Sequence, residues 1–195
     1  MLIRHIDVKP IGPNGSAVGF ASVNGWVHDL LGVNWTLYTI TDWLGLVPIF
    51  IVLGFAVLGL SQLIRRKSLL RVDSSILALG GFYVLVVGAY LFFEHYRVNY
   101  RPVLIDGILE TSYPSSTTML VLCVMPTAMM QFRRLFRNRT VKNAVNVVLA
   151  AFTAFMVIGR LVSGVHWLTD ILGGVLLSAA LVLLYQGANT YIARS

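Results

Sequence analysis

Long apolar runs alternate with short polar segments along most of the chain. A bilayer core takes about 20 apolar residues per helix, and runs of about this length recur with few charges inside them. The third run is the shortest and contains Pro126. The pattern predicts an all-α, polytopic membrane helical bundle of five spans, at roughly residues 44–64, 74–93, 117–132, 143–162 and 169–188.

The first 43 residues follow a different pattern. From Ser16 to Leu31, apolar residues recur at three- and four-residue spacing, which places them on one face of a helix. Aromatic residues suited to a headgroup belt follow at Trp35, Tyr38 and Trp43. We interpret 1–43 as an interfacial amphipathic segment and 44–195 as the membrane-embedded domain; a tilted sixth span is the alternative.

Composition supports a membrane protein. Hydrophobic residues make up 57% of the chain and charged residues 12%, against about 25% charged in a typical soluble domain. The net charge of +7 does not indicate nucleic-acid binding, because the basic residues form two clusters between apolar runs. These clusters are Arg65, Arg66, Lys67 and Arg71, and then Arg133, Arg134, Arg137, Arg139 and Lys142.

The two basic clusters also predict an orientation, since short cytoplasmic loops carry an excess of lysine and arginine. With both clusters in the cytoplasm, the loops 94–116 and 163–168 fall outside a cell membrane. Three polar stretches then meet at the outer face, at residues 98–104, 113–118 and 159–170.

These stretches carry residues suited to phosphoryl transfer. Four positions separate His166 from Asp170, a spacing that predicts one helix face, with the carboxylate holding one imidazole nitrogen. An imidazole held in this way is a nucleophile or general base. Arg101 and Arg160 keep their charge, and their planar guanidinium groups suit phosphate oxygens.

The run Pro114-Ser115-Ser116 predicts a helix start that presents N–H groups and hydroxyls to an anion. Together with two arginines and a histidine, it describes an anion site that works through a phosphohistidine. No cluster of acidic residues and histidines with metal-ligand spacing accompanies it. We therefore expect no metal and no other cofactor.

The motifs resemble those of the type-2 phosphatidic acid phosphatase superfamily, integral-membrane lipid phosphatases that share a helical core with vanadium haloperoxidases. The family pattern is lysine, six residues and Arg-Pro; then Pro-Ser-Gly-His; then Ser-Arg, five residues, histidine, three residues and aspartate. The resemblance covers roughly residues 44–190. The matching residues are Arg101-Pro102, then Pro114-Ser115, then Arg160, His166 and Asp170.

The resemblance implies a role for each matched residue. In the family, the histidine that matches His166 attacks phosphorus, and the aspartate that matches Asp170 orients it. The residues that match Arg101, Arg160 and Ser115 hold the phosphate, and Ser116 is expected to assist them. The resemblance also implies a substrate that is a lipid phosphate or diphosphate drawn from the surrounding membrane lipids.

Several positions depart from the family pattern. Glu94 stands in place of the lysine, Ser116 and Thr117 in place of glycine and histidine, and Gly159 in place of serine. The missing histidine is the family's general acid, and general acid catalysis contributes typically about 10²–10⁴-fold. Hydrolysis of a simple phosphate ester should suffer by roughly that factor.

A diphosphate substrate avoids this loss. A monoester expels an alkoxide, whose conjugate acid is about as weak as water, with a pKa of roughly 15.7. A lipid diphosphate expels a phosphate monoester, whose second pKa is about 6. We therefore expect a preference for a polyprenyl diphosphate of the undecaprenyl type, as used in cell-wall synthesis.

Two other classes remain open from the sequence. A pseudo-phosphatase would bind lipid phosphates or a membrane partner without turnover, and the replacements at Glu94 and Thr117 favour it. A transporter would place charges near the bilayer midplane, whereas the charges here gather at one end of the spans. Residue by residue, the arginines could be interfacial, His166 and Asp170 a structural tie, and Ser115 a helix cap. The oligomeric state does not follow from the sequence.

Overall fold

The computed structural model describes residues 2–192, and these residues contain helices but no β-sheet. Short 3₁₀ helices lie at Leu2–Arg4, Pro13–Gly15 and Leu69–Arg71. The α-helices of the described chain are α1 (Ala21–Leu31), α2 (Trp35–Leu44), α3 (Leu46–Arg66), α4 (Ser74–His95), α5 (Ser116–Leu135), α6 (Arg139–Val162) and α7 (Leu168–Ile192).

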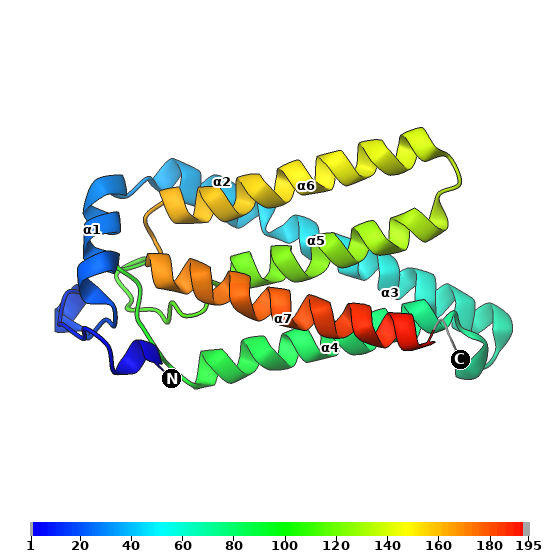
Figure 1. Ribbon diagram of the computed structural model, residues 1–195, viewed down its shortest axis with the longest axis horizontal. Helices are drawn as coiled ribbons and strands as arrows, with labels where there is room; N and C mark the ends of the chain where they lie inside the picture. The colour runs from blue at the N-terminus through cyan, green and yellow to red at the C-terminus, as the bar shows by residue number, and fades with distance from the viewer. Residues whose placement is uncertain (1, 193–195) are drawn as a thin grey trace.

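The long helices α3 to α7 lie side by side and alternate in direction along the bundle (Figure 1). Each corresponds to one of the five spans expected from the sequence, and their order is unchanged. The connections 67–73, 136–138 and 163–167 are short, whereas 96–115 is long. The segments 96–115 and 163–167 lie at the same end of the bundle, where α1 crosses the helix ends (Figure 1).

Helix α5 is the centre of the bundle, because it packs against α3, α4, α6 and α7. By length and hydropathy, four helical stretches of the described residues could cross a membrane, and α5 is not one of them. Two of its buried polar side chains lie within hydrogen-bond distance of tyrosines on neighbouring helices. Gln131 Nε2 donates to the Tyr185 hydroxyl at 2.8 Å, and Thr127 Oγ1 lies 3.2 Å from the Tyr83 hydroxyl. Neighbouring helices shield α5 from lipid, so it needs less apolar surface than they do.

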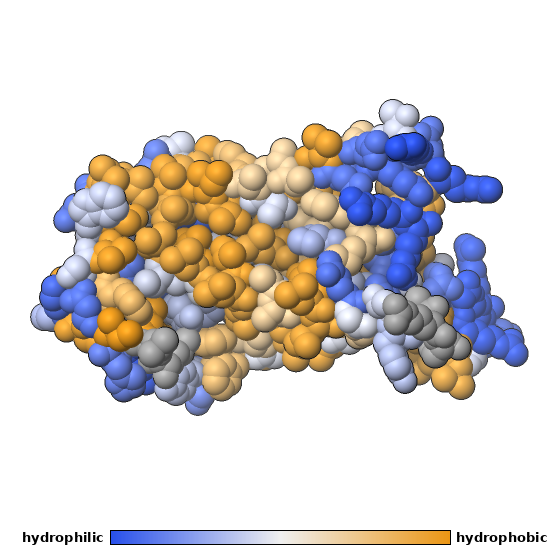
Figure 2. Space-filling view, in the orientation of Figure 1, coloured by the Kyte–Doolittle hydropathy of each residue, from blue (hydrophilic) through white to orange (hydrophobic). Residues whose placement is uncertain are grey.

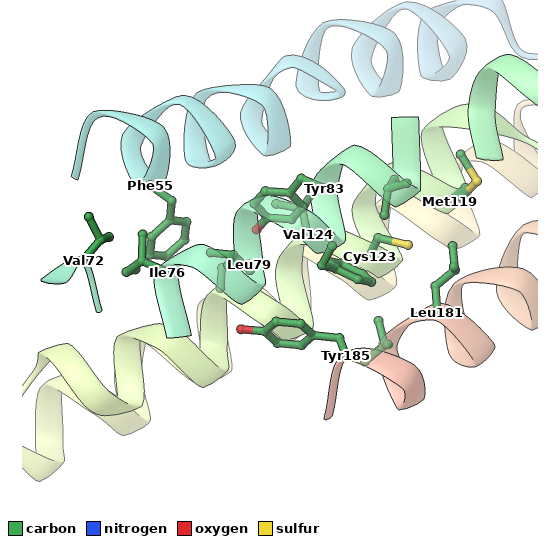
Figure 3. Packing of buried hydrophobic residues seen from close by; sticks show 14 residues of the cluster. Phe55, Val72, Ile76, Leu79, Tyr83, Met119, Cys123, Val124, Leu181 and Tyr185 are labelled. Atoms are coloured by element: carbon green, nitrogen blue, oxygen red, sulfur yellow. The ribbon is translucent and has the colours of Figure 1, made fainter. Parts of the chain in front are cut away.

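The apolar core runs along the middle of the bundle and joins α3, α4, α5 and α7 (Figure 3). Phe55 from α3 and Val124 from α5 belong to this core, as does Leu181 from α7. Tyr83 and Tyr185 keep their hydroxyls bonded while their rings pack in it. This packing fixes the helix ends that carry the polar loops.

The outer surface of the helices is also apolar. Figure 2 shows hydrophobic residues along the middle of the molecule and hydrophilic residues towards both ends. Val84, Val147 and Leu176 are each about 70% exposed, although they lie in the middle of long helices. Apolar side chains on this scale would be unfavourable in water and are typical of contact with lipid. The chain is a membrane protein.

The structure divides the N-terminal segment into two parts. Helix α1 has 11 residues, starts at Ala21 rather than Ser16, and spans only about 16 Å, too short for a sixth span. Trp35–Leu44, which we expected at the interface, is helical and runs through Gly45 into α3. Together α2 and α3 give a 32-residue apolar stretch, Trp35–Arg66, and α2 packs against α6.

Gly164 has a backbone conformation and a position that exclude a side chain. Its φ is +68°, and a Cβ there would lie 1.8 Å from the Gly32 carbonyl oxygen. We expect Gly164→Ala to lose about 1–2 kcal/mol from the left-handed conformation alone, and more from the clash. The thermal unfolding midpoint in detergent should therefore fall by several degrees. Gly187→Ala, which meets nothing within 4 Å on α7, is the matched control and should leave the midpoint unchanged or raise it.

Candidate active site

The long connection 96–115 folds back on itself and places two polar residues beside each other. The Arg101 N–H donates to the Glu110 carbonyl at 3.0 Å, and the Ser112 N–H donates to the Asn99 carbonyl at 2.9 Å. This pairing aligns Arg101 and Ser112, both buried, towards the same side of the loop.

The turn between α6 and α7 presents the histidine. His166 lies before α7, which begins at Leu168, whereas Asp170 lies in the first turn of α7. The two residues therefore do not share a helix face as the four-residue spacing predicted. The Trp167 N–H donates to Asp170 Oδ2 at 2.9 Å, and the Trp167 indole donates to the Tyr100 carbonyl at 2.7 Å. These bonds join the turn to both α7 and the long loop.

Two guanidinium groups converge on one imidazole nitrogen. Arg101 Nη1 lies 3.3 Å and Arg160 Nη2 lies 3.2 Å from His166 Nε2. Arg160 is 1% exposed and His166 4% exposed, so both are shielded from water. The first and third polar stretches of the sequence thus meet in one site, where Arg101 and Arg160 both lie beside His166.

The other imidazole nitrogen contacts a residue that sequence reasoning missed. Ser112 Oγ lies 3.1 Å from His166 Nδ1, and the same hydroxyl donates to Asp170 Oδ2. His166 Nδ1 and Asp170 Oδ2 are themselves 3.8 Å apart, which is too far for a hydrogen bond. No motif singles out Ser112, which lies two residues before Pro114.

Burial and two neighbouring cations lower the pKa of His166. Burial disfavours the charged imidazole, and the positive charges of Arg101 and Arg160 add to this effect. The backbone carbonyl of Ser112 opposes the shift as a hydrogen-bond acceptor, but the pKa still falls well below its ordinary value of 6.5. His166 is therefore neutral near pH 7 and has a free lone pair.

Helix α2 supplies neighbours to Arg160. Asp42 Oδ1 lies 3.6 Å from Arg160 Nη1, and the guanidinium carbon lies 5.0 Å from the centre of the Tyr38 ring. No local pattern in the sequence points to this contact, because α2 and the end of α6 are more than 100 residues apart. Asp42 is 58% exposed, so its carboxylate offsets only part of the buried charge.

Several donors of the two arginines have no hydrogen-bond partner in the described part of the chain. These are the Nε atom of Arg101 and the Nε and Nη1 atoms of Arg160. Arg101 Nε lies 3.0 Å from Glu110 Oε2, which makes an ion pair, but its N–H does not point at that oxygen. Buried polar groups are rarely left unpaired. An anion with several acceptor oxygens, such as phosphate, would satisfy them.

A cavity of about 430 Å³ opens beside the imidazole. Arg101, Ser112 and His166 contribute to its wall, and so does Ser116. Glu94 also lines it and accepts from Thr111 Oγ1 at 3.3 Å. The remaining lining comes from the end of α4, the long loop and the start of α5, namely Tyr90, Phe93, Arg97, Tyr100, Leu109, Glu110, Thr111, Tyr113, Pro114 and Met119.

The residues of the second motif take different positions. Ser115 is fully buried, caps α5 by accepting from the Thr118 N–H at 3.4 Å, and donates its own N–H to the Asp170 carbonyl at 3.0 Å. Ser116 faces the cavity, whereas Thr117 does not line it. The Thr117 methyl lies against Gly45, 3.5 Å from where a Cβ would be. Phosphate binding by Ser115 and Ser116 stays a prediction.

No group of three or more His, Cys, Asp or Glu side chains in residues 2–192 is arranged to hold a metal ion. The acidic residues of the site are instead distributed singly, with Glu110 beside Arg101 and Asp42 beside Arg160.

The depressed pKa of His166 predicts its titration in the resting protein. In ¹⁵N-histidine NMR of the protein in micelles, the His166 signal, assigned with His166→Gln, should stay that of a neutral imidazole below pH 6.5. Arg101→Gln removes one of the two neighbouring cations and should raise this pKa. Arg97→Gln, a cavity arginine that makes no contact with the imidazole, is the control. A wild-type titration near pH 6.5 would contradict the prediction.

The lowered pKa of His166 also makes the stability of the protein depend on pH. The unfolded chain binds a proton at His166 near pH 6.5, and the folded chain does so only at lower pH. The contribution of His166 to the free energy of unfolding should therefore decrease as pH falls from 6.5 towards the folded pKa.

Comparisons with known proteins agree with the geometry of this site. A structure search finds similarity to a protein described as the first transmembrane PAP2 type phosphatidylglycerolphosphate phosphatase from Bacillus subtilis. The TM-score is 0.62 at 21% identity, over 89% of this chain and 87% of that chain, which shows a shared fold. A comparison with curated protein sequences gives no significant match.

The family model of the PAP2 superfamily matches residues 81–192, more than half of the chain. The matched range contains every residue that converges on the imidazole, from Arg101 and Ser112 to Arg160 and Asp170. The resemblance inferred from the three motifs is confirmed, and the chain belongs to the PAP2 superfamily of membrane phosphatases.

Proposed function

We propose that this protein hydrolyses a lipid phosphate, preferentially a polyprenyl diphosphate of the undecaprenyl type, through a phosphohistidine on His166. The observation that carries the proposal is the position of the neutral Nε2 atom within 3.3 Å of both Arg101 and Arg160. A phosphate held by the two guanidinium groups would place its phosphorus next to the imidazole lone pair.

The proposed reaction has two steps. In the first, the Nε2 lone pair forms a bond to phosphorus, and the bond from phosphorus to the leaving oxygen breaks with its electrons on that oxygen. In the second, a water oxygen attacks phosphorus, the N–P bond breaks, and both water protons leave with the inorganic phosphate. The charges of Arg101 and Arg160 stabilise the developing negative charge in both steps. Neither step uses a metal ion.

The second motif supports the preference for a diphosphate. Thr117, which occupies the position of the family's general acid, cannot donate a proton near neutral pH and does not line the cavity. A phosphate monoester leaving group has a pKa of about 6 and departs without a proton donor. An alkoxide leaving group, with a pKa of roughly 15.7 for its conjugate acid, does not.

The change in the first motif affects how a phosphate group would be bound in the cavity. Glu94, in the place of the family lysine, points its carboxylate at Thr111 and brings no positive charge to the cavity. Arg97 lines the same cavity three residues later and supplies a cation to its wall. We infer that Arg97 takes part of the lysine's role in holding the distal phosphate of a diphosphate.

The distribution of charge supports an extracytoplasmic site. The basic residues of 65–71 and 133–142 lie at the end of the bundle opposite the imidazole (Figures 1 and 2). With this basic end in the cytoplasm, the cavity opens on the outer face of the cell membrane, where a spent diphosphate carrier would be recycled.

A second candidate function is binding without turnover. The observation that favours it is the loss of the acid at Thr117 together with the charge reversal at Glu94. A pseudo-phosphatase of this kind would retain lipid phosphates through Arg101 and Arg160 or would contact a membrane partner. Its site would bind phosphate but form no covalent intermediate.

A phosphate-release panel tests substrate and nucleophile together. The purified protein, with a metal chelator present, is supplied with prenyl diphosphate, prenyl monophosphate, phosphatidic acid and phosphatidylglycerol phosphate. We expect the diphosphate to react about 10²–10⁴-fold faster than the monoesters, because only its leaving group needs no acid. His166→Ala should abolish release. Ser178→Ala removes a buried hydroxyl on α7 that donates to the Met119 carbonyl and not to a polar group of the site, and it should keep the wild-type rate. Equal rates with diphosphate and monoesters would contradict the preference.

Trapping of the intermediate separates the enzyme from the pseudo-phosphatase. After rapid mixing with ³²P-labelled prenyl diphosphate and an alkaline quench, the wild type should carry acid-labile, base-stable label. His166→Ala should carry none. Lipid phosphate binding without label or release in the wild type would instead establish binding without turnover.

A further inference from the structure

We propose that Ser112 is a positioning residue of the site: its hydroxyl joins Asp170 to Nδ1 of His166 and holds the imidazole with Nε2 free of a proton. The inference rests on the proposed role of His166 as nucleophile. It replaces the expected direct contact between Asp170 and His166 with a chain of hydrogen bonds that passes through Ser112.

The distances favour the serine over a direct contact. Asp170 Oδ2 lies 3.8 Å from His166 Nδ1, beyond hydrogen-bond length, whereas Ser112 Oγ lies 3.1 Å from that nitrogen. The Ser112 hydroxyl also bonds to Asp170 Oδ2. The serine oxygen therefore lies between the two groups and contacts both.

With Asp170 ionised, counting protons gives the direction of each bond. An ionised carboxylate only accepts, so the single hydroxyl proton of Ser112 points at Asp170. The Ser112 oxygen then offers its lone pairs to His166, and the imidazole proton must sit on Nδ1. A neutral imidazole has one N–H, so Nε2 is left with its lone pair facing Arg101 and Arg160.

The surroundings of Asp170 hold its carboxylate in place. Its Oδ2 accepts from the Trp167 N–H at 2.9 Å, and the residue lies in the first turn of α7, where the helix dipole favours a negative charge. Its Oδ1 has no hydrogen-bond partner among the described residues. Asp170 is fully buried, and the Ser112 hydroxyl and the Trp167 N–H both donate to its carboxylate.

The backbone keeps Ser112 in position. Ser112 is 2% exposed, and its N–H donates to the Asn99 carbonyl at 2.9 Å within the folded loop. Replacing Ser112 by alanine leaves this backbone bond in place and removes only the hydroxyl, so that the imidazole loses its connection to Asp170.

The chain of bonds matters most during the attack on phosphorus. When Nε2 forms its bond to phosphorus, positive charge develops on the imidazole, and the Nδ1–H becomes a stronger donor. The Ser112 hydroxyl passes this polarisation to the Asp170 carboxylate while every proton stays on its own atom. Arg101 and Arg160, which hold the phosphate, take no part in this chain.

Kinetics test the inference. We expect Ser112→Ala to lower kcat with prenyl diphosphate about 10–100-fold, as for other residues that orient a histidine, with KM within about twofold because both arginines remain. Ser112→Thr, which keeps the hydroxyl, should recover most of the loss, and Ser178→Ala should match the wild type.

In the Ser112→Ala/Asp170→Asn double variant, kcat should be close to that of Asp170→Asn alone, since both changes break the same chain of hydrogen bonds.

Histidine NMR of the resting protein provides a readout that does not depend on turnover. The ¹⁵N pattern of His166, assigned with His166→Ala, should be that of the Nδ1–H tautomer in the wild type. In Ser112→Ala, the Nε2–H tautomer should gain population. A purely structural serine would lower the unfolding midpoint and raise KM without changing the tautomer.

The possible failures are distinguishable. If His166→Ala keeps its activity, the proposed function is wrong, and the tautomer measurement still decides the role of Ser112. If His166→Ala is inactive while Ser112→Ala keeps the wild-type rate and tautomer, only the inference about Ser112 is wrong. Multiplicative effects of Ser112→Ala and Asp170→Asn would also overturn it, because independent residues do not form one chain.

Discussion

The contact of two buried guanidinium groups with one imidazole nitrogen is the constraint on which the rest of this structure depends. Like charges repel, and each arginine has only a partly exposed carboxylate beside it, Glu110 for Arg101 and Asp42 for Arg160. Burial of a charge is costly without a partner. The site therefore keeps a positive potential, which favours an anion with several oxygens and, together with the larger effect of burial, keeps His166 neutral.

The bundle tolerates this arrangement because the charges lie at its end. The packing of α5 against four helices sets the relative positions of the loop 96–115 and the turn 163–167. Small residues then let the backbones approach, as where Gly164 meets Gly32. Rigid helices thus hold the polar groups to within hydrogen-bond distance, which is the preorganisation that phosphoryl transfer requires.

The departures from the family pattern divide the site into two halves. In the proposed mechanism, the half that attacks phosphorus extends through Ser112 to a buried aspartate, whereas the half that would protonate a leaving group is missing, with Thr117 turned towards Gly45. Under that proposal, the site would select substrates by the acidity of the leaving group. The chemistry of the lipid, and not only its shape, would then decide which substrate is cleaved.

The sequence by itself determined that the chain lies in a membrane, where its five spans fall and which residues form the motifs, because hydropathy and fixed spacing are local properties of the chain. It predicted that Arg101, Arg160, His166 and Asp170 gather at one end, and they do. Only the tertiary structure decided that His166 precedes α7, that Ser112 lies between it and Asp170, and that α2 covers Arg160. These contacts join segments up to about 120 residues apart, and their geometry depends on helix packing and loop path, which no local pattern encodes.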